Sequence, residues 1–167
     1  NTATQIQLAS NLGGRQPVYG HHSLLTGLSG NNLSKRFGSL SLKDLRASGI
    51  EPMGLINLIS AIGSSRPVKI FQSIAEVCEE FEIGTFSSAP TKFDPDLLLS
   101  ISSRTLTALP LKQVSQQLTE IGIPQHELSA FWDMARENVT NREDLSKLYK
   151  MCLEGQYFHA VSDKFDD

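Results

Sequence analysis

The hydrophobic positions of this chain recur mainly at spacings of three and four residues, which is the period of an amphipathic helix. Capping residues or prolines stand in front of several of these runs, and glycines follow several of them. The pattern predicts helices that begin at or near Asn1, Ser41, Pro52, Val68, Asp94, Pro110, Pro124 and Thr140. A short strand is expected at residues 18–25, which contain Val, Tyr and Leu. The predicted fold is therefore mainly α.

Most of the predicted helices have an apolar face that is expected to lie in the core. The expected core positions are Leu55, Ile56, Ile59 and Ile62; Phe71, Ile74, Val77, Cys78 and Phe81; Leu97, Leu98 and Ile101; Leu111, Val114, Leu118 and Ile121; Leu128, Phe131, Trp132 and Ala135; and Leu145, Leu148 and Cys152. Capping boxes are predicted for Ser41 with Asp44 and for Thr140 with Glu143. The acidic tail is expected to add a last turn or two of helix, built on Phe158, Val161 and Phe165.

Composition narrows the possible functions. The 167 residues are 40% hydrophobic and 20% charged, with a net charge of −3, so the chain lacks the overall positive field of a strongly basic nucleic-acid binder. Its longest apolar stretch, residues 54–63, is about half of the ~20 residues that cross a bilayer, and no membrane partner is expected. Cys78 and Cys152 stand alone, which favours a reducing, cytoplasmic setting. The first residues show no basic region followed by an apolar one, so no secretory signal is expected, and the start at Asn1 instead of Met favours a fragment.

Residues 31–38 form the one segment whose residue types suit reaction chemistry more than packing. Lys35 and Arg36 follow the hydroxyl of Ser34, and glycines on both sides predict a mobile loop that brings Lys35 onto a phosphate chain. An ammonium placed where negative charge develops is worth roughly 3 to 4 kcal/mol of transition-state stabilisation. A Ser-Lys-Arg tripeptide is common, however, and on its own it more often marks a solvated basic loop.

The surrounding residues give the segment its context. Residues 18–52 resemble the signature-loop region of class I aminoacyl-tRNA synthetases, specifically the glutamyl branch. The matching positions are residues 19–25, Leu33, Ser34, Lys35 and Arg36, Gly38, residues 41–45 and residues 49–52. Similar matches occur at residues 1–2 and 5–6, 92–94, 97–98, 108–110, 131, 137–140 and 143–144. The resemblance therefore extends over nearly the whole chain.

The resemblance implies a ligase that activates glutamate with ATP and Mg²⁺ and transfers it to tRNA. Leu33, Ser34, Lys35 and Arg36 would contact ATP, with Lys35 as the catalytic residue. The first position of the family motif is often lysine, and Asn32 stands there in this chain, which leaves Lys35 and Arg36 to carry the charge. The His-containing ATP motif and the amino-acid pocket of the family are absent from these residues. The chain alone is therefore expected to be inactive and to bind no cofactor.

The resemblance also implies three domains. Residues 1–28 would be the C-terminal remnant of a Rossmann-type catalytic domain, and residues 29–110 the signature loop with a helical stem-contact domain. Residues 111–167 would form the first helical anticodon-binding domain, with the second one absent. The expected tRNA contacts are Lys43, Arg46, Arg66 and Lys69, each of which is also typical of an ordinary solvated side chain. The enzyme is expected to be a monomer, and its expected partner is the glutamate tRNA. The sequence leaves open whether it also charges the glutamine tRNA.

Two other functions remain as alternatives. One is a synthetase paralogue that glutamylates a modified base in tRNA, but that paralogue lacks a helical anticodon extension. The other is a non-catalytic helical nucleic-acid-binding module, indicated by two helices joined at Gly49. Against the second, residues 52–62 contain no Arg, Lys or Gln to read base edges.

Two further features favour structural roles. Adjacent strand residues point to opposite faces, so His21 and His22 are not expected to share a metal ion, and no metal site is predicted. Trp132 lies on an apolar helical face, which favours core packing over stacking on a base.

Overall fold

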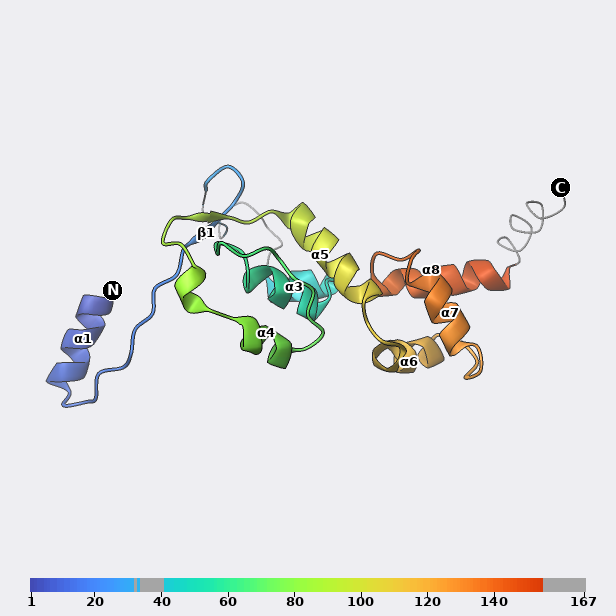
Figure 1. Ribbon diagram of the computed structural model, residues 1–167, viewed down its shortest axis with the longest axis horizontal. Helices are drawn as coiled ribbons and strands as arrows, with labels where there is room; N and C mark the ends of the chain where they lie inside the picture. The colour runs from blue at the N-terminus through green and yellow to red at the C-terminus, as the bar shows by residue number, and fades with distance from the viewer. Residues whose placement is uncertain (32, 34–40, 155–167) are drawn as a thin grey trace.

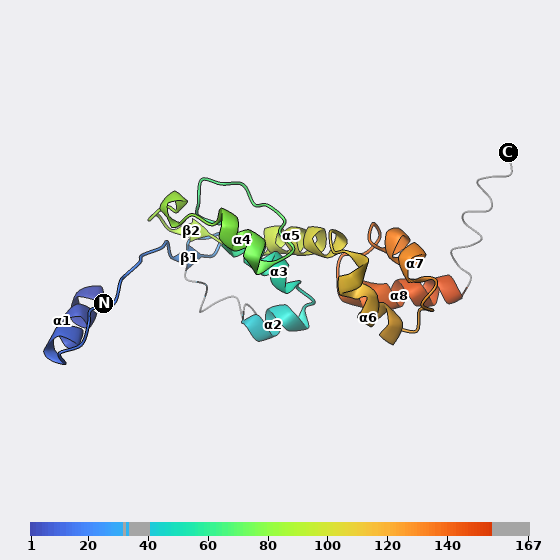
Figure 2. The same ribbon diagram turned by 60° about the horizontal axis from the view of Figure 1, so that its bottom comes forward.

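The computed structural model describes residues 1–31, 33 and 41–154, which form an elongated chain of helices with one small sheet (Figure 1). The elements in chain order are α1 (Thr2–Asn11), β1 (Leu25–Thr26), α2 (Leu42–Ala47), α3 (Pro52–Ile59), α4 (Ile74–Glu80), the 3-10 helix η2 (Ile83–Thr85), β2 (Thr91–Lys92), α5 (Pro95–Thr107), α6 (Leu111–Glu120), α7 (Leu128–Ala135) and α8 (Arg142–Leu153). Both views place α1 at one end and α6, α7 and α8 at the other (Figures 1 and 2). Among the described residues, no helix is both long and apolar enough to cross a membrane.

The N-terminal helix α1 stands apart from the rest of the chain. It buries none of its residues, and it ends before Gly13, whose φ of 66° lies in the left-handed region, as the sequence predicted. The prediction of a strand over residues 18–25 was wrong in extent, because the strand covers only Leu25–Thr26. A strand needs a hydrogen-bonding partner, and β2 offers only Thr91–Lys92.

The first hydrophobic cluster lies where α3 crosses α5. Its buried residues are Leu58, Phe93, Leu98 and Ile101, and half-buried side chains from the neighbouring segments surround them. The two helices approach closely at Gly54, where a Cβ atom would lie 2.7 Å from the Cα of Ser102. The prediction for Asp94 and Pro95 is confirmed, since Asp94 caps α5 and Pro95 is its first residue.

The predicted apolar faces of α3 and α5 need correction. Gly54, Asn57 and Leu58 are the buried residues of α3, whereas Ile59 is 45% exposed. Asn57 is buried because its amide donates hydrogen bonds to the Phe71 carbonyl at 3.1 Å and the Thr105 hydroxyl at 3.3 Å. On α5, Leu98 and Ile101 are buried as predicted, but Leu97 is 40% exposed.

The helix predicted over residues 68–81 is only half as long in the structure. Residues 68–73 are not helical, and α4 begins after Ser73, whose hydroxyl accepts a hydrogen bond from the Glu76 amide. The amide of Phe71 donates to the side chain of Asn57 at 3.3 Å, so this stretch is bonded across to α3. Val77 is buried, but the prediction that Ile74, Cys78 and Phe81 line the core was wrong, because all three are exposed.

The second hydrophobic cluster joins the end of α5 to α6, α7 and α8. Its buried residues are Leu106, Leu109, Val114, Leu118, Ile123, Leu128, Phe131, Trp132, Ala135, Val139, Leu145 and Leu148. The indole of Trp132 is buried and donates to the Leu109 carbonyl at 3.2 Å, so core packing is confirmed for this residue. The second cluster includes Leu106 of α5 as well as residues after position 110, so packing does not mark a boundary there. The predicted domain boundary at residue 110 remains a prediction.

The start of α8 differs by one position from the predicted capping box. Asn141, not Thr140, is the N-cap, and its side chain accepts hydrogen bonds from the amides of Glu143 at 2.9 Å and Asp144 at 3.1 Å. The reciprocal bond comes from the Asn141 amide to Asp144, so Asp144 replaces the predicted Glu143. The helix predicted around Phe158, Val161 and Phe165 lies outside the described residues.

Candidate functional site

Residues 33–41, here called the signature segment, include the predicted ATP contacts Leu33 to Arg36 and are attached to the fold at both ends. Leu33 is half-buried and packs against the first cluster. Ser41 is the N-cap of α2 and makes the predicted capping interaction with Asp44, accepting from its amide at 3.1 Å and donating to its carboxylate at 2.6 Å. The predicted contact residues Ser34, Lys35 and Arg36, like Asn32 and Gly38, lie outside the described residues.

A parallel strand pair fixes the chain that leads into this segment. The amides of Thr91 and Phe93 donate to the carbonyls of Leu24 at 3.0 Å and Thr26 at 2.8 Å. The hydroxyl of Ser23, a buried residue just before β1, lies 2.9 Å from that of Thr91 in β2, which adds a side-chain link between the two segments. The turn that follows β1 is closed by a bond from the Gly27 amide to the Asn31 carbonyl at 2.8 Å. Leu33 is therefore held between an ordered turn and the first cluster.

The two adjacent histidines make different local contacts. His22 places Nδ1 2.8 Å from the carbonyl oxygen of Ser23, and His21 places Nε2 3.3 Å from the hydroxyl of Thr2. Within the described part of the chain, no group of three His, Cys, Asp or Glu side chains is arranged to hold a metal ion.

The four cations predicted to contact tRNA occupy two separate places in the fold. Lys43 and Arg46 are exposed on α2, next to the end of the signature segment. Arg66 and Lys69 lie between α3 and α4, where Arg66 pairs with Glu82 and Lys69 with Glu80. These two cations line a hollow of about 420 Å³ with an apolar wall. Because each pair is solvent-exposed, its carboxylate offsets the local positive charge without fixing the side chain firmly.

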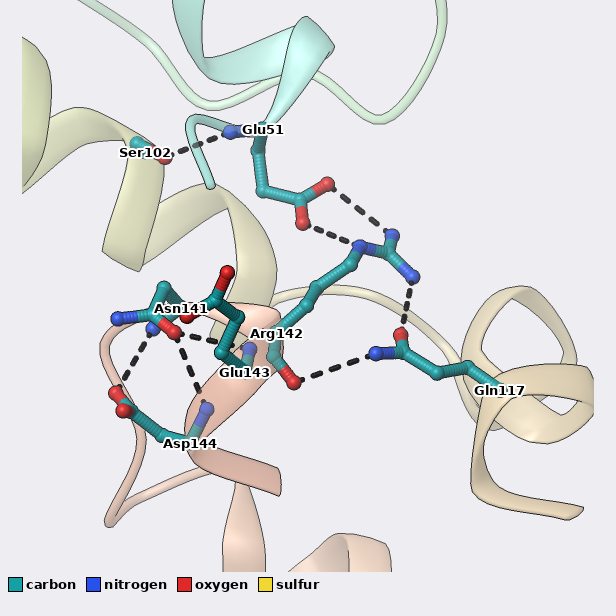
Figure 3. A network of polar contacts seen from close by, with 7 residues as sticks. All are labelled: Glu51, Ser102, Gln117, Asn141, Arg142, Glu143 and Asp144. Atoms are coloured by element: carbon teal, nitrogen blue, oxygen red, sulfur yellow. Dashed lines mark hydrogen bonds and ion pairs between the residues drawn. The ribbon is translucent and has the colours of Figure 1, made fainter. Parts of the chain in front are cut away.

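A polar network that sequence reasoning missed lies between the two hydrophobic clusters (Figure 3). The carboxylate of Glu51, which is 5% exposed, accepts hydrogen bonds from Nε and Nη2 of Arg142, the second at 3.1 Å. Nη1 of Arg142 donates to the side-chain oxygen of Gln117 at 2.9 Å, and the Gln117 amide donates back to the Arg142 carbonyl at 3.2 Å. The network therefore links the N-terminus of α3 with α6 and α8 (Figure 3).

One sequence signal pointed to this network. Arg142 is the first residue of α8, where the helix dipole disfavours a cation, so an arginine at that position indicates an anionic partner elsewhere. This signal does not identify Glu51 as the partner, since the two residues are 91 positions apart. In the structure the Glu51 side chain makes no capping bond at the N-cap of α3 and pairs with Arg142 instead.

Asp144 lies in the first turn of α8 and forms the capping box with Asn141, which is directly beside Arg142 in the chain. Burial would raise the pKa of its carboxyl, but hydrogen bonds from Lys147, Thr140 and Asn141 outweigh that effect and lower the pKa below its ordinary value of 3.8. The ionised carboxylate thus stabilises the start of α8 from which Arg142 extends.

Comparison with known proteins identifies the family. Residues 1–99 match the family described as tRNA synthetases class I (E and Q), catalytic domain. The match covers more than half of the chain, and the chain belongs to this family. It is 46% identical over 155 residues to glutamate–tRNA ligase 1 of Ruegeria pomeroyi and 45% identical over 155 residues to glutamate–tRNA ligase 2 of Dinoroseobacter shibae. Each alignment covers 93% of this chain and 35% of the relative, so the chain spans about a third of these curated relatives' length.

Solved structures show the same fold. A glutamate tRNA ligase from Elizabethkingia meningosepticum superposes with a TM-score of 0.68 and 20% sequence identity, covering 89% of this chain and 35% of that one. The glutamate–tRNA synthetase of Elizabethkingia anophelis gives a TM-score of 0.65 at 19% identity. The predicted fold class is confirmed at this level: a mainly helical chain with a small parallel sheet, folded as in these ligases.

Proposed function

We propose that this chain is part of a glutamate–tRNA ligase, which activates glutamate with ATP and transfers it to the end of its tRNA. The observation that carries the proposal is the 46% identity that runs over 155 residues of a relative named for that activity. The match includes α6, α7 and α8, which supports this reading over a paralogue without a helical extension. The matched family of catalytic domains likewise favours a ligase over a non-catalytic binding module.

The attachment of the signature segment supports a role for Lys35 in ATP chemistry. Leu33 and Ser41 hold the two ends of the segment next to the α3 and α5 platform, so the intervening residues 34–40 connect two fixed points. In the proposed reaction the glutamate carboxylate attacks the α-phosphorus of ATP, and pyrophosphate leaves. Negative charge grows on the departing phosphates, and the Lys35 ammonium would lower the barrier by binding them most strongly in the transition state. Leu33, Ser34 and Arg36 would position the same nucleotide.

The partners follow from the proposed reaction. ATP enters as its Mg²⁺ complex, in which phosphate oxygens hold the metal. The tRNA partner is the glutamate tRNA, with the glutamine tRNA as a second candidate, and Lys43 and Arg46 are placed to contact its backbone from α2. We propose that the enzyme acts as a monomer in the cytoplasm, in keeping with its two unpaired thiols, Cys78 and Cys152.

Substitution of Lys35 tests the catalytic assignment. In the full-length protein, Lys35→Ala is expected to slow glutamate-dependent pyrophosphate exchange, measured with tRNA present, by about 10² to 10³. Lys112→Ala is the matched control, because Lys112 is exposed on α6, far along the chain from the signature segment. An exchange rate for Lys35→Ala equal to that of the control would contradict the assignment.

Charging assays test the substrate. The full-length protein is expected to attach glutamate to the glutamate tRNA, and parallel reactions with the glutamine tRNA define its range. Failure to charge either tRNA, with glutamate transferred instead to a base within a tRNA, would favour the paralogue.

A further inference from the structure

We propose that Arg142 and Glu51 are positioning residues. They fix the direction in which α6, α7 and α8 extend from the packed helices α3 and α5, which carry the signature segment, and they thereby place the bound tRNA. This inference rests on the proposed function for its meaning in tRNA binding. Its structural part, a fixed joint between two helical units, depends only on the contacts of these residues.

The joint has few other polar links to hold it. Apart from the continuous helix α5, the described hydrogen bonds between side chains that join α3 to α8 are those of Arg142 with Glu51. The fork of a guanidinium on a carboxylate restrains distance and angle together, which a single bond does not. Rotation of α8 about the end of α5 would break both bonds at once.

Each partner of the joint is itself held in place. The backbone amide of Glu51 donates to the buried hydroxyl of Ser102 on α5 at 2.8 Å, so the carboxylate projects from a position fixed on α3 and α5. On the other side, the two bonds with Gln117 tie Arg142 to α6 (Figure 3). The capping box of Asn141 and Asp144 sets where α8 begins. The pair therefore connects two units that are each rigid at the point of contact.

Burial makes the pair sensitive to loss of either member. Glu51 is almost fully buried, and Arg142 is its ion-pair partner, so removal of the guanidinium would leave a carboxylate without compensation. Gly49, with φ of 74°, packs its backbone beside Asn141, where a Cβ atom would lie 3.5 Å from the Asn141 Cβ. The chain just before Glu51 thus rests directly against the start of α8.

The positioning role predicts a specific kinetic pattern. In the full-length ligase, a variant with a loosened joint should bind tRNA less well, while its chemistry at saturating tRNA is preserved. For the double variant Glu51→Met with Arg142→Met, we expect the KM for tRNA to rise about tenfold, within the range of coupling between contacting residues. The kcat at saturating tRNA and the KM values for ATP and glutamate should stay within about twofold. The double variant removes both charges, so it avoids the buried carboxylate without a partner that Arg142→Met alone would leave.

A distance measurement tests the joint independently of ligase activity. Spin labels on Cys78 of α4 and on Lys150→Cys of α8, with Cys152→Ser and the other cysteines of the full-length protein replaced, report the distance between the two units. Cys78 and Lys150 are both exposed. The wild-type distribution should be narrow, and that of the double variant should be broader. Lys112→Met is the matched control, because Lys112 is exposed on α6 and lies outside the network of Glu51, Arg142 and Gln117, so this change should leave the width unchanged.

The two measurements separate the two proposals. An unchanged width in the folded double variant, or an unchanged KM for tRNA, overturns the positioning role. If the wild-type protein does not charge tRNA, the proposed function is overturned. The distance distribution then still decides whether Glu51 and Arg142 hold the joint.

Discussion

At the scale of single residues, Gly54 shows how a missing side chain sets the distance between two helices. Gly54→Ala would place a Cβ atom 2.7 Å from the Cα of Ser102, which belongs to backbone and has little room to move. Alanine gains about 1 kcal/mol of helix propensity, but overpacking costs typically 1 to 3 kcal/mol, and contact with backbone at this crossing favours the upper end, so a net loss of up to about 2 kcal/mol is expected. Urea unfolding of the wild type and of Gly54→Ala measures this difference in the free energy of unfolding. Gly84→Ala meets nothing within 4 Å and should change stability by no more than about 0.5 kcal/mol.

Single polar residues also mark the limit of sequence reasoning. Asn57 was overlooked as a core residue because the amide partners that make its burial favourable, Phe71 and Thr105, lie 14 and 48 positions away. Glu51 and Arg142 were overlooked for the same reason. The residues of the candidate site, in contrast, came from a contiguous motif, Leu33 to Arg36, that resembles a known family, and of these four residues the structure describes Leu33.

At the scale of elements, helix boundaries were predicted best where a local signal sets them. Ser41, Asp94 and Gly13 act through bonds or backbone angles within a few residues, and all three predictions were correct. The helix prediction for the first half of residues 68–81 was wrong. The apolar residues there have the helical period, but the backbone amide of Phe71 is bonded to the Asn57 side chain and not within a helix. A pattern of period 3.6 permits a helix and does not exclude such a tertiary competitor.

The start of α8 predicts a dependence of stability on pH. Folding lowers the pKa of Asp144 below 3.8, so its stabilising contribution is complete above that value and is lost as the pH falls through the lower pKa of the folded state. Asp144→Asn should therefore be less stable than wild type near neutral pH, by about 1 kcal/mol for a weakened cap, and the difference should shrink as the pH falls from neutral to well below 3.8. Urea midpoints of the two proteins across this range measure the effect. A difference that stays constant on acidification would show that the carboxylate charge is not responsible.

At the scale of the whole molecule, α5 is the element that makes two cores one structure. Leu98 and Ile101 on its first half belong to the first cluster, and Leu106 near its end belongs to the second. Both views show α5 running from one group of helices to the other (Figures 1 and 2). A helix that is continuous across both cores transmits loss of one to the other, so the described chain is expected to unfold in one cooperative transition.

Interrupting α5 between the two cores tests this coupling. Arg104 is exposed, so Arg104→Pro acts mainly on the backbone: it removes one helical hydrogen bond and clashes with the preceding turn, at a cost of about 3 kcal/mol or more. We expect calorimetry to show two separate transitions for Arg104→Pro and one for Arg104→Ala, which loses the same side chain but keeps the helix. In the proline variant, amide hydrogen exchange should become faster at the end of α5 than in α3. A single transition in both variants would mean that the bonds of Glu51 and Arg142 suffice to couple the cores without an unbroken helix. In that case, adding Glu51→Met and Arg142→Met to Arg104→Pro should produce two transitions.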